Sequence, residues 1–429
     1  MNKENIKIAV VGLGYVGLPL ACLFARKYEV VGFDINKARV AELKTGHDST
    51  DTFSDDEMKH SLTHGLTCTD DESLLNSRNF FVVSVPTPVT SNHRVDLNPL
   101  LGATVVVGRH LKRGDIVVYE STVYPGATEE DCVPVLEQVS GLRYNEDFFI
   151  GYSPERINPG DHEHTIEKIR KITSGSTPEV ADFIDSVYNS VLENGTHRAP
   201  TIRVAEAAKI IENCQRDVNI AFMNEIDHIF NAMNINTRDV IEAAGTKWNF
   251  IRLEPGLVGG HCIGVDPYYL IQKAREAGET ASLLSTARTL NDTMGTYIAD
   301  LTIKHMSLAG LTPKNARILV LGFTFKENCN DIRNTKVIDI ITELRRYSKN
   351  ITICDPYAIP EMTKQEYGVD IVSDIKQVES KKYDTILLCV KHAEFADLPI
   401  EQMLDTNGIL CDIKGFYRNK RDEKYYIEI

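Results

Sequence analysis

The chain has 429 residues, of which 42% are hydrophobic and 25% charged, and its formal net charge is −14. This length predicts two or three domains of ordinary globular composition. The negative charge disfavours nucleic acid and anionic membranes as partners, and no apolar run reaches the roughly 18–20 residues of a membrane span. The short apolar run near the N-terminus is typical of a strand and not of a signal peptide, so we expect a cytoplasmic protein.

The first expected elements are a strand over residues 6–11, a glycine-rich loop, a helix and a second strand that ends at Asp34. In the spacing Gly12-x-Gly14-x-x-Gly17, the first glycine suits a tight turn, the second admits a pyrophosphate, and the third allows close helix–strand packing. The pyrophosphate is expected at the helix N-terminus. Asp34 follows roughly 20 residues after Gly12, where a carboxylate binds a ribose diol and repels a 2′-phosphate, so the pattern predicts NAD and not NADP.

Later strands of the same region end in polar loops. "NFFVVSVPTP" ends in a proline-rich loop, "DIVVYESTVYPG" in a loop with Ser121 and Thr122, and "FFIGYSPERINPG" in a loop with Glu155. Because ligands of open α/β sheets bind at the carboxyl ends of the strands, these loops are expected to line a ligand site.

A long helix is expected over residues 201–234, where apolar residues recur at helical spacing and neither Gly nor Pro occurs. A helix of this length is suited to connecting two domains. Lys209 and Asn213 stand four residues apart and therefore share one face, with Arg216 a turn further on. A solvated polar stripe is the alternative interpretation.

The turn-rich segment "GLVGGHCIGVDPYYL" (257–271) places Cys262 shortly after two glycines. A cysteine that serves only as filler is easier to bury in a regular strand or helix, so this thiol is a candidate for chemistry. The nine cysteines are odd in number and form no CxxC pair, which argues against a disulfide framework and a zinc ribbon. No metal site is expected, and Cys354 and Cys389 have the surroundings of strand filler.

A second α/β pattern starts at residue 317, after a boundary near 310–317. It repeats the order strand, loop, helix and strand ending in Asp, but lacks GxGxxG. Its first loop contains Lys326 and Arg333, which suits another phosphate-bearing ligand, with a surface basic pair as the alternative.

Together these segments resemble the UDP-glucose and UDP-N-acetylhexosamine 6-dehydrogenases over essentially the whole chain. The resemblance rests on "VGLGYVGLPLA", "GFDIN", "VSVPTP", "ESTVYPGAT", "YSPERINPG", "EAAKIIEN", "GGHCIGVDPYYL" and "LGFTFKENCNDIRNT". It implies an α/β fold of two Rossmann-like doubly wound domains joined by a long central helix, in a homodimer or higher oligomer. The expected domains are an NAD-binding domain (1–200), a central helical and dimerisation region with the cysteine loop (201–310), and a UDP-sugar-binding domain (311–429).

Members of this family oxidise the C6 primary alcohol of a nucleotide sugar to a carboxylate with two NAD. The first hydride transfer gives an aldehyde, a thiolate adds to it as a thiohemiacetal, and the second transfer gives a thioester that water hydrolyses. The resemblance implies that Cys262 is the nucleophile. It also implies that Gly259 and Gly260 leave room for the sugar C6 and the nicotinamide beside the sulfur.

The resemblance assigns further roles residue by residue. Lys209 would stabilise a developing alkoxide, Asn213 would position substrate and water, and Asp266 would order a water. Either Glu155 or a water acts as general base. The implied catalytic residues are Cys262, Lys209, Asn213, Asp266, Glu155 and Thr122. The implied cofactor contacts are Gly12, Gly14, Tyr15, Val16, Gly17, Asp34, Arg39, Thr87 and Thr122. The implied substrate contacts are Glu155, Arg156, Lys209, Asn213, Arg252, Gly259, Lys326 and Arg333.

The residue before the cysteine indicates the substrate branch. UDP-glucose dehydrogenases typically have a small residue there, as in GGSC, whereas this chain has His261, followed by "IGVDPYYL". This is similar to the branch that acts on UDP-N-acetylglucosamine or UDP-N-acetylgalactosamine for capsule or O-antigen polysaccharide, and "KWNFIRLEPGLVGGHC" favours the same branch. UDP-N-acetylmannosamine and UDP-glucose are the alternative substrates.

Three other functions compete with this interpretation. A single-step NAD dehydrogenase of the 3-hydroxyacid or 6-phosphogluconate type shares the first domain and the helical lysine but has no use for Cys262. A nucleotide-sugar epimerase or dehydratase requires Tyr-x-x-x-Lys, which occurs from Tyr269 to Lys273, far outside the first Rossmann domain. The joint presence of the helical and cysteine-loop residues disfavours an inactive nucleotide-binding module.

Overall fold

The computed structural model describes residues 5–50, 53–90, 94–156, 165–260, 262–421 and 423–428. The chain divides into two compact units. The first comprises Met1–Glu212 and Tyr268–Glu279, and the second comprises Asn213–Pro267 and Thr280–Ile429. The three-part division expected at residues 200 and 310 stays a prediction.

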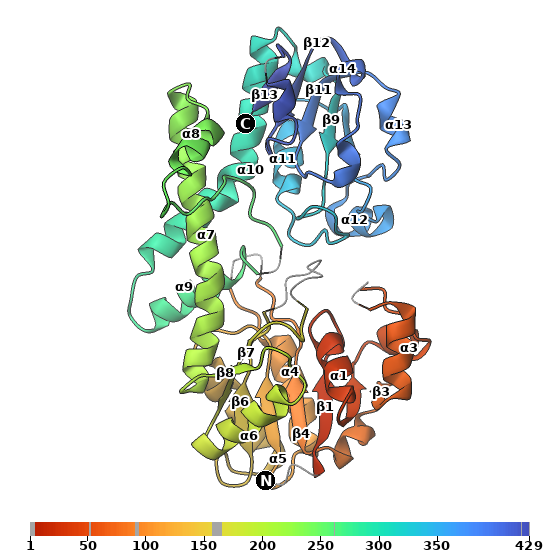
Figure 1. Ribbon diagram of the computed structural model, residues 1–429, viewed down its shortest axis with the longest axis vertical. Helices are drawn as coiled ribbons and strands as arrows, with labels where there is room; N and C mark the ends of the chain where they lie inside the picture. Colours follow the sequence, from red (N-terminus) through yellow and green to blue (C-terminus); the bar gives the residue numbers. More distant parts are fainter. Residues whose placement is uncertain are drawn as a thin grey trace. The chain divides into compact units, whose positions relative to one another are not determined.

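The first unit is built on a mostly parallel sheet (Figure 1). Among the described residues its strand order is β3-β2-β1-β4-β5-β6-β7-β8, and the β6–β7 pair is antiparallel. The order from β3 to β6 is that of the dinucleotide-binding doubly wound sheet. The strands are β1 (Lys7–Val11), β2 (Glu29–Phe33), β3 (Leu66–Thr69), β4 (Phe80–Val83), β5 (Ile116–Tyr119), β6 (Phe149–Tyr152), β7 (Lys171–Gly175) and β8 (Thr196–Arg198).

The central strands of this sheet end in line. Val11, Val83, Tyr119 and Tyr152 are the last residues of β1, β4, β5 and β6, and each is the register partner of the next. The polar loops that follow these strands therefore leave the sheet at one edge, where doubly wound sheets bind their ligands.

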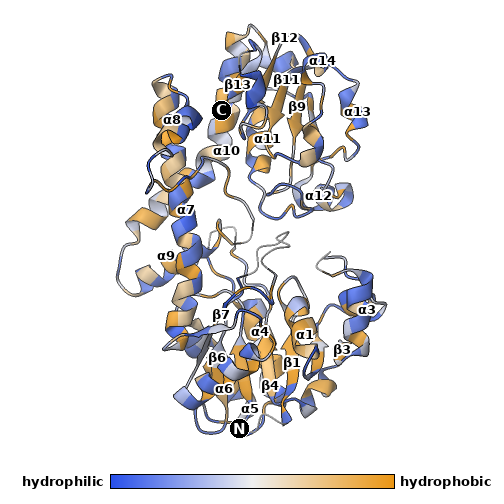
Figure 2. Ribbon diagram, viewed as in Figure 1, coloured by the Kyte–Doolittle hydropathy of each residue, from blue (hydrophilic) through white to orange (hydrophobic). Residues whose placement is uncertain are grey.

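Helices cover both faces of the first sheet. Alternate strand residues such as Ile8, Val10 and Val82 form one apolar cluster with α1 and α6, while the intervening Ala9 and Val83 are also fully buried. Figure 2 shows the central strands β1 and β4 in hydrophobic colours. The helices of this part are α1 (Gly17–Ala25), α2 (Lys37–Lys44), α3 (Asp55–Thr63), α4 (Asn98–His110), α5 (Val133–Ser140) and α6 (Pro178–Asn189).

The second unit contains a parallel sheet with the order β10-β9-β11-β12-β13 in the described residues (Figure 1). This is the order 2-1-3-4-5 of flavodoxin-like folds. Val320 packs with α10 and α11, and Leu319 packs in a separate cluster on the other face. The strands are β9 (Ile318–Leu321), β10 (Ile351–Cys354), β11 (Tyr383–Leu388), β12 (Leu404–Asp412) and β13 (Tyr426–Glu428). The helices are α10 (Ser282–Leu308), α11 (Val337–Leu344), α12 (Pro360–Tyr367), α13 (Lys376–Glu379) and α14 (Ile400–Met403).

The expected long helix is α7 (Ile202–Ala232), and the boundary between the two units falls within it. Two shorter helices follow, α8 (Thr237–Ala244) and α9 (Asp266–Glu276). The two sheets and the long helix confirm the expected fold class. No helix in the described part of the chain combines the length and apolar character that a membrane crossing requires.

Candidate active site

The loop between β1 and α1 is shaped by its glycines. Gly12 has a φ of +96°, and a Cβ there would lie 2.8 Å from the carbonyl oxygen of Ser84. A Cβ at Gly17 would overlap the carbonyl oxygen of Gly12, so only glycine lets α1 approach β1 this closely. Gly14 is exposed, and no atom lies within 4 Å of the place of its missing Cβ. The loop is therefore open to a ligand above Gly14, next to the N-terminus of α1.

Asp34 follows β2 directly, and backbone groups hold its carboxylate. Oδ2 accepts the N–H of Leu13 at 2.8 Å, and Oδ1 accepts the N–H of Asn36 at 2.8 Å. The carboxylate thus lies beside the glycine loop, where a Rossmann fold binds the adenosine ribose.

Arg39 reaches the same loop, but its guanidinium is already paired. Nε donates to the carbonyl of Leu13 at 3.1 Å, Nη1 pairs with Glu42 at 2.9 Å, and Nη2 pairs with the buried carboxylate of Asp48 at 2.6 Å. A nearby arginine can accommodate the 2′-phosphate of NADP. In this chain two carboxylates offset that charge.

Thr87 and Thr122 lie in neighbouring loops that hydrogen bonds hold together. Thr87 Oγ1 donates to the carbonyl of Thr122 at 2.6 Å, and Ser121 Oγ donates to the carbonyl of Val85 at 2.6 Å. The hydroxyl of Tyr152, the last residue of β6, donates to the carbonyl of Ser121 at 3.1 Å. The ends of β4, β5 and β6 therefore form one connected edge.

The loop after β6 contains Glu155 and Arg156. The Glu155 side chain is buried. The guanidinium of Arg156 pairs with Glu212 of α7 at 2.8 Å and donates to the carbonyl of Arg170 at 2.8 Å. Arg156 thus ties this loop to α7, and its expected contact with substrate stays a prediction.

Helix α7 places Lys209 in the first unit, with a buried side chain. One turn earlier, the buried carboxylate of Glu206 accepts the N–H groups of Gly126 at 2.6 Å and Thr128 at 3.0 Å. Gly126 lies in the loop that contains Thr122 and Thr128 begins the short π-helix after it, so Glu206 fastens the end of that loop close to Lys209 along the helix. Burial raises the pKa of Glu206 to about 7.

In the second unit, Asn213 and Asp266 form a buried pair. Asn213 Nδ2 donates to Asp266 Oδ2 at 2.5 Å. Asp266 is the first residue of α9, and its backbone N–H donates to the carbonyl of Cys262 at 2.8 Å; the N–H of Val265 donates to the same carbonyl at 3.1 Å. Cys262 therefore lies in the turn that opens α9, with its backbone bonded to that of Asp266.

Cys262 differs from the other cysteines in its exposure. All nine lie in the described part of the chain and are free thiols; Cys262 is exposed, Cys329 is half-buried and the rest are buried. Burial raises the pKa of Cys22 to about 11 and the pKa values of Cys68 and Cys132 to about 12, which keeps such thiols protonated at neutral pH. Of these thiols, Cys262 is the one that a ligand from solvent reaches most readily.

The Gly-Gly pair before this cysteine packs closely on the loop after β9. A Cβ at Gly259 would lie 2.8 Å from the carbonyl oxygen of Asn334, and a Cβ at Gly260 would lie 2.9 Å from the ring of Phe325. Gly260 also has a φ of +80°. Close packing between these two segments therefore requires both glycines, whatever space they also leave for ligands.

Asn224 of α7 holds the start of the cysteine segment. Its side-chain amide accepts the N–H of Gly256 at 2.7 Å and donates to the carbonyl of Gly256 at 3.1 Å and to Asn291 of α10 at 2.8 Å. Asn291 donates in turn to Asp217 at 2.7 Å, and Asp217 pairs with the buried Arg288 at 2.5 Å. Sequence reasoning missed this role of Asn224, because its partner lies 32 residues away.

A small cavity of about 20 Å³, with room for roughly one water molecule, lies at the carboxyl edge of the second sheet, between the ends of β9 and β11, where the strand order predicts a ligand site. It is lined by Leu257, Gly259, Thr324, Phe325, Glu327, Thr335, Lys336, Val337, Cys389, Val390 and Lys414. Burial lowers the pKa of Lys414. Lys336 and Lys414 are cationic groups that sequence reasoning missed, since neither belongs to a recognisable phosphate-binding motif.

Lys326 and Arg333, the two basic residues for which the sequence predicted substrate contacts, do not line this cavity. Lys326 and Arg333 both lie in the loop between β9 and α11. The guanidinium of Arg333 makes two bonds to the carboxylate of Asp331, at 2.8 and 2.6 Å. Their expected substrate contacts stay predictions.

In each sheet, the aspartate that follows the second strand in sequence (β2 or β10) holds the loop that follows the first strand (β1 or β9). Asp355, directly after β10, accepts the N–H groups of Phe323 at 2.6 Å and Thr324 at 2.9 Å, and His392 Nε2 lies 2.9 Å from the same oxygen. Asp34 holds the corresponding loop of the first sheet in the same way. The repeated order of strand, loop, helix and strand ending in Asp thus extends to hydrogen bonding.

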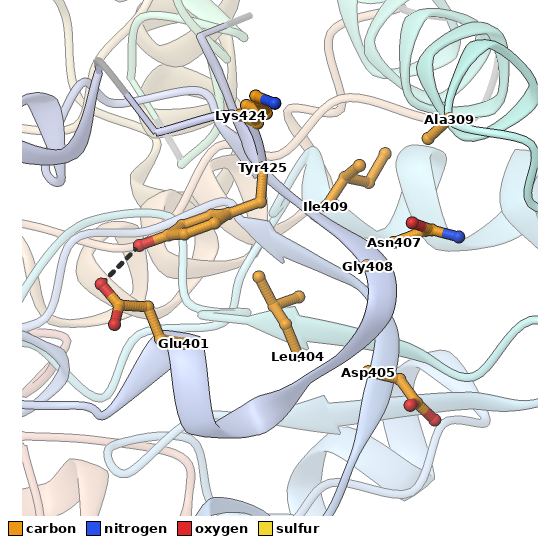
Figure 3. Close-up of a pocket in the computed structure, with 9 residues that line it drawn as sticks. All are labelled: Ala309, Glu401, Leu404, Asp405, Asn407, Gly408, Ile409, Lys424 and Tyr425. Atoms are coloured by element: carbon orange, nitrogen blue, oxygen red, sulfur yellow. Dashed lines mark hydrogen bonds between the residues drawn. The ribbon is translucent and has the colours of Figure 1, made fainter.

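A larger hollow of about 470 Å³ lies at the opposite, amino edge of the second sheet (Figure 3). In it the Tyr425 hydroxyl donates to Glu401 at 2.9 Å. Its lining residues are Ala309, Glu401, Leu404, Asp405, Asn407, Gly408, Ile409, Lys424 and Tyr425. Because doubly wound sheets bind ligands at their carboxyl edge, we assign no substrate to this hollow.

The remaining predicted residues lie as follows. Tyr15 and Val16 are half-buried between β1 and α1, and Arg252 is exposed in an irregular segment. His261, on which the substrate branch was predicted, lies outside the described residues. Among the described residues, no three or more His, Cys, Asp or Glu side chains are grouped to hold a metal ion.

Three family models match the chain in succession. They are the NAD binding domain (residues 6–192), the central domain (203–293) and the UDP binding domain (319–419) of the UDP-glucose/GDP-mannose dehydrogenase family. The glycine loop with Asp34 lies in the first range, Lys209 and the cysteine segment in the second, and most of the cavity at β9 and β11 in the third.

Individual proteins match over nearly the whole chain. A UDP-N-acetyl-D-glucosamine 6-dehydrogenase of Pseudomonas aeruginosa is 52% identical, covering 96% of this chain and 97% of that protein. An enzyme of the same name from Salmonella typhi is 48% identical, covering 99% and 97%. A solved structure of a UDP-D-ManNAc dehydrogenase from Pyrococcus horikoshii superposes with a TM-score of 0.89 at 30% identity, covering 99% of both chains.

Proposed function

The chain belongs to the UDP-glucose/GDP-mannose dehydrogenase family of NAD-binding oxidoreductases, and on that basis we propose that its substrate is a UDP-N-acetylhexosamine of the gluco or galacto type. The enzyme oxidises the C6 hydroxymethyl group to the uronic acid with two NAD. The observation that supports this substrate is the pair of relatives named as UDP-N-acetyl-D-glucosamine 6-dehydrogenases, at about half identity over nearly the full length. The product serves as a precursor of surface polysaccharide, as the family resemblance implies.

The exposed thiol of Cys262 is the nucleophile in this proposal. The first hydride leaves C6 for NAD, and the alcohol becomes an aldehyde with release of a proton. The sulfur then adds to the aldehyde carbon and gives a thiohemiacetal. A second hydride passes to a second NAD and leaves a thioester, which water cleaves to the carboxylate and the free thiol. The exposure of Cys262 supports this assignment, because the other thiols are buried except for the half-buried Cys329.

Groups on α7 and at the start of α9 assist the thiol. Lys209 stabilises the alkoxide and the tetrahedral adducts with its ammonium group. The Asn213–Asp266 hydrogen bond orients an amide and a carboxylate near the turn that contains Cys262, which suits the positioning of a water for hydrolysis. Glu155 or a water takes the hydroxyl proton, and Thr122 contacts the reacting groups.

The two nucleotides bind on different sheets. NAD binds at the glycine loop and Asp34, with Tyr15, Val16, Arg39 and Thr87 around it. The UDP moiety binds over the carboxyl edge of the second sheet, where Lys336 and Lys414 line a cavity too small to enclose it. Lys336 is already paired with Asp292 at 3.0 Å and Asp339 at 3.1 Å, so Lys326, Arg333 and Arg252 are needed to supply further positive charge to the substrate site.

The enzyme acts as a homodimer or higher oligomer. Helix α7 exposes large apolar side chains at Val204, Ile211, Phe222 and Ile229, between 46% and 62% of each being accessible. Their spacing of seven and eleven residues places them on one side of the helix. A second copy of the chain is the partner that would bury such a stripe.

A panel of UDP-sugars tests the substrate. NADH release is measured with UDP-N-acetylglucosamine, UDP-N-acetylgalactosamine, UDP-N-acetylmannosamine and UDP-glucose, with Cys262→Ala as the control. We expect two NADH per sugar and the highest kcat/KM for one of the first two. Faster turnover of UDP-glucose or UDP-N-acetylmannosamine would overturn the substrate proposal but not the family assignment. The likeness to the Pyrococcus enzyme makes UDP-N-acetylmannosamine the alternative to compare first.

A further inference from the structure

A buried ion pair lies behind the carboxyl edge of the first sheet. Lys171 Nζ is 2.6 Å from Glu120 Oε2, and the Tyr188 hydroxyl donates to Glu120 Oε1 at 2.6 Å. All three side chains are fully buried. The ammonium also lies 5.8 Å from the centre of the Tyr188 ring. The three groups form a closed polar cluster inside an apolar core.

The cluster connects two loops of the candidate active site. Glu120 follows β5 and immediately precedes Ser121 and Thr122. Lys171 Nζ donates a second hydrogen bond, at 3.1 Å, to the carbonyl of Pro154, the residue before Glu155. One ammonium group therefore joins the start of the Thr122 loop to the backbone beside Glu155.

The topology of the sheet explains how Lys171 reaches this edge. Lys171 is the first residue of β7, which runs antiparallel to β6 with Tyr152 opposite Ser174. In a fully parallel sheet the first residue of a strand lies at the amino edge. The reversal of β7 brings Lys171 to the carboxyl edge, next to the loop that follows β6.

Stability alone does not account for such a pair. Burial raises the pKa of Glu120 to about 7 even though Lys171 lies beside it, which reflects a large desolvation penalty. Replacing a buried pair by apolar residues of similar volume is often neutral or stabilising. Apolar side chains of similar volume at both positions would fill this space as well, but they would leave the Pro154 carbonyl without the donor that Lys171 Nζ supplies.

We propose that Lys171 is a positioning residue, which holds the Pro154 carbonyl and so sets the place of Glu155, while Glu120 and Tyr188 hold Lys171. This inference rests on the proposed function through the role of Glu155. Displacement of a reacting group by about 1 Å costs roughly 100-fold in rate. The expected signature is therefore a loss of kcat that does not follow the loss of stability.

The test compares Lys171→Met with the double variant Glu120→Met/Lys171→Met. The single variant leaves Glu120 unpaired, so its melting temperature and its kcat both fall. The double variant removes both charges, so its melting temperature recovers, whereas its kcat stays about 10- to 100-fold below wild type. Recovery of kcat together with melting temperature in the double variant would show a merely structural pair and overturn the proposal. The assay uses whichever UDP-sugar the wild type oxidises, so a wrong sugar does not affect the comparison.

Three further variants keep the test decisive. Arg78→Met breaks the Arg78–Glu29 pair of 2.6 Å near the opposite edge of the same sheet, in which the arginine is buried and the glutamate exposed, and should lower melting temperature without lowering kcat. Glu155→Gln must lower kcat; wild-type kcat there would remove both the role of Glu155 and this inference. If the double variant does not fold, Tyr188→Phe decides: a severalfold loss of kcat at unchanged KM for NAD supports the proposal, and unchanged kcat overturns it.

Discussion

Substitution of Asp34 and Asp48 should shift the cofactor selectivity from NAD towards NADP. The perturbation is Asp34→Asn, which removes the charge and keeps an oxygen that can accept the N–H of Leu13. A 2′-phosphate bound at the ribose site would lie beside the carboxylate of the wild type. Two unit charges about 4 Å apart repel each other by ~1 kcal/mol in water and ~4 kcal/mol at an effective dielectric constant of ~20. Asp34 is half-buried, so we expect roughly 1–3 kcal/mol, or about 5- to 150-fold in favour of NADP.

Asp48 adds a second contribution through Arg39. In the wild type the guanidinium is bound by Asp48 at 2.6 Å and by Glu42 at 2.9 Å, so its charge is largely offset. In Asp34→Asn/Asp48→Asn the arginine retains one carboxylate partner and can turn to a 2′-phosphate. We expect a further gain for NADP of about tenfold, which corresponds to ~1.4 kcal/mol.

The assay measures kcat/KM for NAD and NADP at saturating UDP-sugar, and the readout is the ratio of the two values. A general loss of stability, for example from the lost bonds of Asp48 to Thr50 and Phe53, lowers both values and leaves the ratio unchanged. Glu42→Gln is the matched comparison, because it removes the other carboxylate from Arg39 and should shift the ratio towards NADP in the same direction. An unchanged ratio in Asp34→Asn would refute the assignment of Asp34 to the ribose. Equal ratios in the single and the double variant would refute the role of Asp48.

The remaining predictions concern the chemistry and the stability of the chain. Cys262→Ser should stall after the first hydride transfer with a burst of about one NADH per active site; steady formation of the uronic acid would show that the thiol is dispensable. Lys209→Ala should lose kcat far more than substrate affinity, and a wild-type kcat would place this lysine outside the chemistry. The pKa of Glu206 rises from 4.5 to about 7 on folding, so its favourable contribution is complete below pH 4.5 and is lost as pH rises through 7. The melting temperature of Glu206→Gln minus that of wild type should therefore increase between pH 5 and 8, and a difference that stays constant or decreases over this range would contradict the assignment. Asp217→Ala removes one of the two carboxylates that pair with the buried Arg288 and leaves Asp292 as the other. The substitution should cost about 3–5 kcal/mol, seen as a lower melting temperature. An unchanged melting temperature would show that the pair is not a stabilising contact.

Local patterns in the sequence determined the main elements of this protein. The Gly12-x-Gly14-x-x-Gly17 spacing, the strand before it and the acid at position 34 are encoded within some thirty residues, and the structure places them as the pattern predicts. The long helix was predictable for the same reason, because helical periodicity is a property of neighbouring residues. The family motifs then directed attention to Cys262 among nine cysteines.

Tertiary structure decided the partners of these residues. No local pattern indicates that Asp48 pairs with Arg39, or that Arg156 is bound by Glu212 and so is partly occupied. Charged side chains at separate positions look alike in sequence, and their partners depend on which loops the fold brings together.

The Gly-Gly pair illustrates the same limit. Gly259 and Gly260 were expected to leave space for ligands, yet their missing side chains also allow close contact with Phe325 and Asn334, which lie more than sixty residues later. Lys171 is the strongest case, because nothing in "KITSG" marks a buried cation. Only the antiparallel pairing of β7 brings it within reach of Glu120 and Pro154, since the direction of a strand within a sheet is set by the whole fold and not by its own residues.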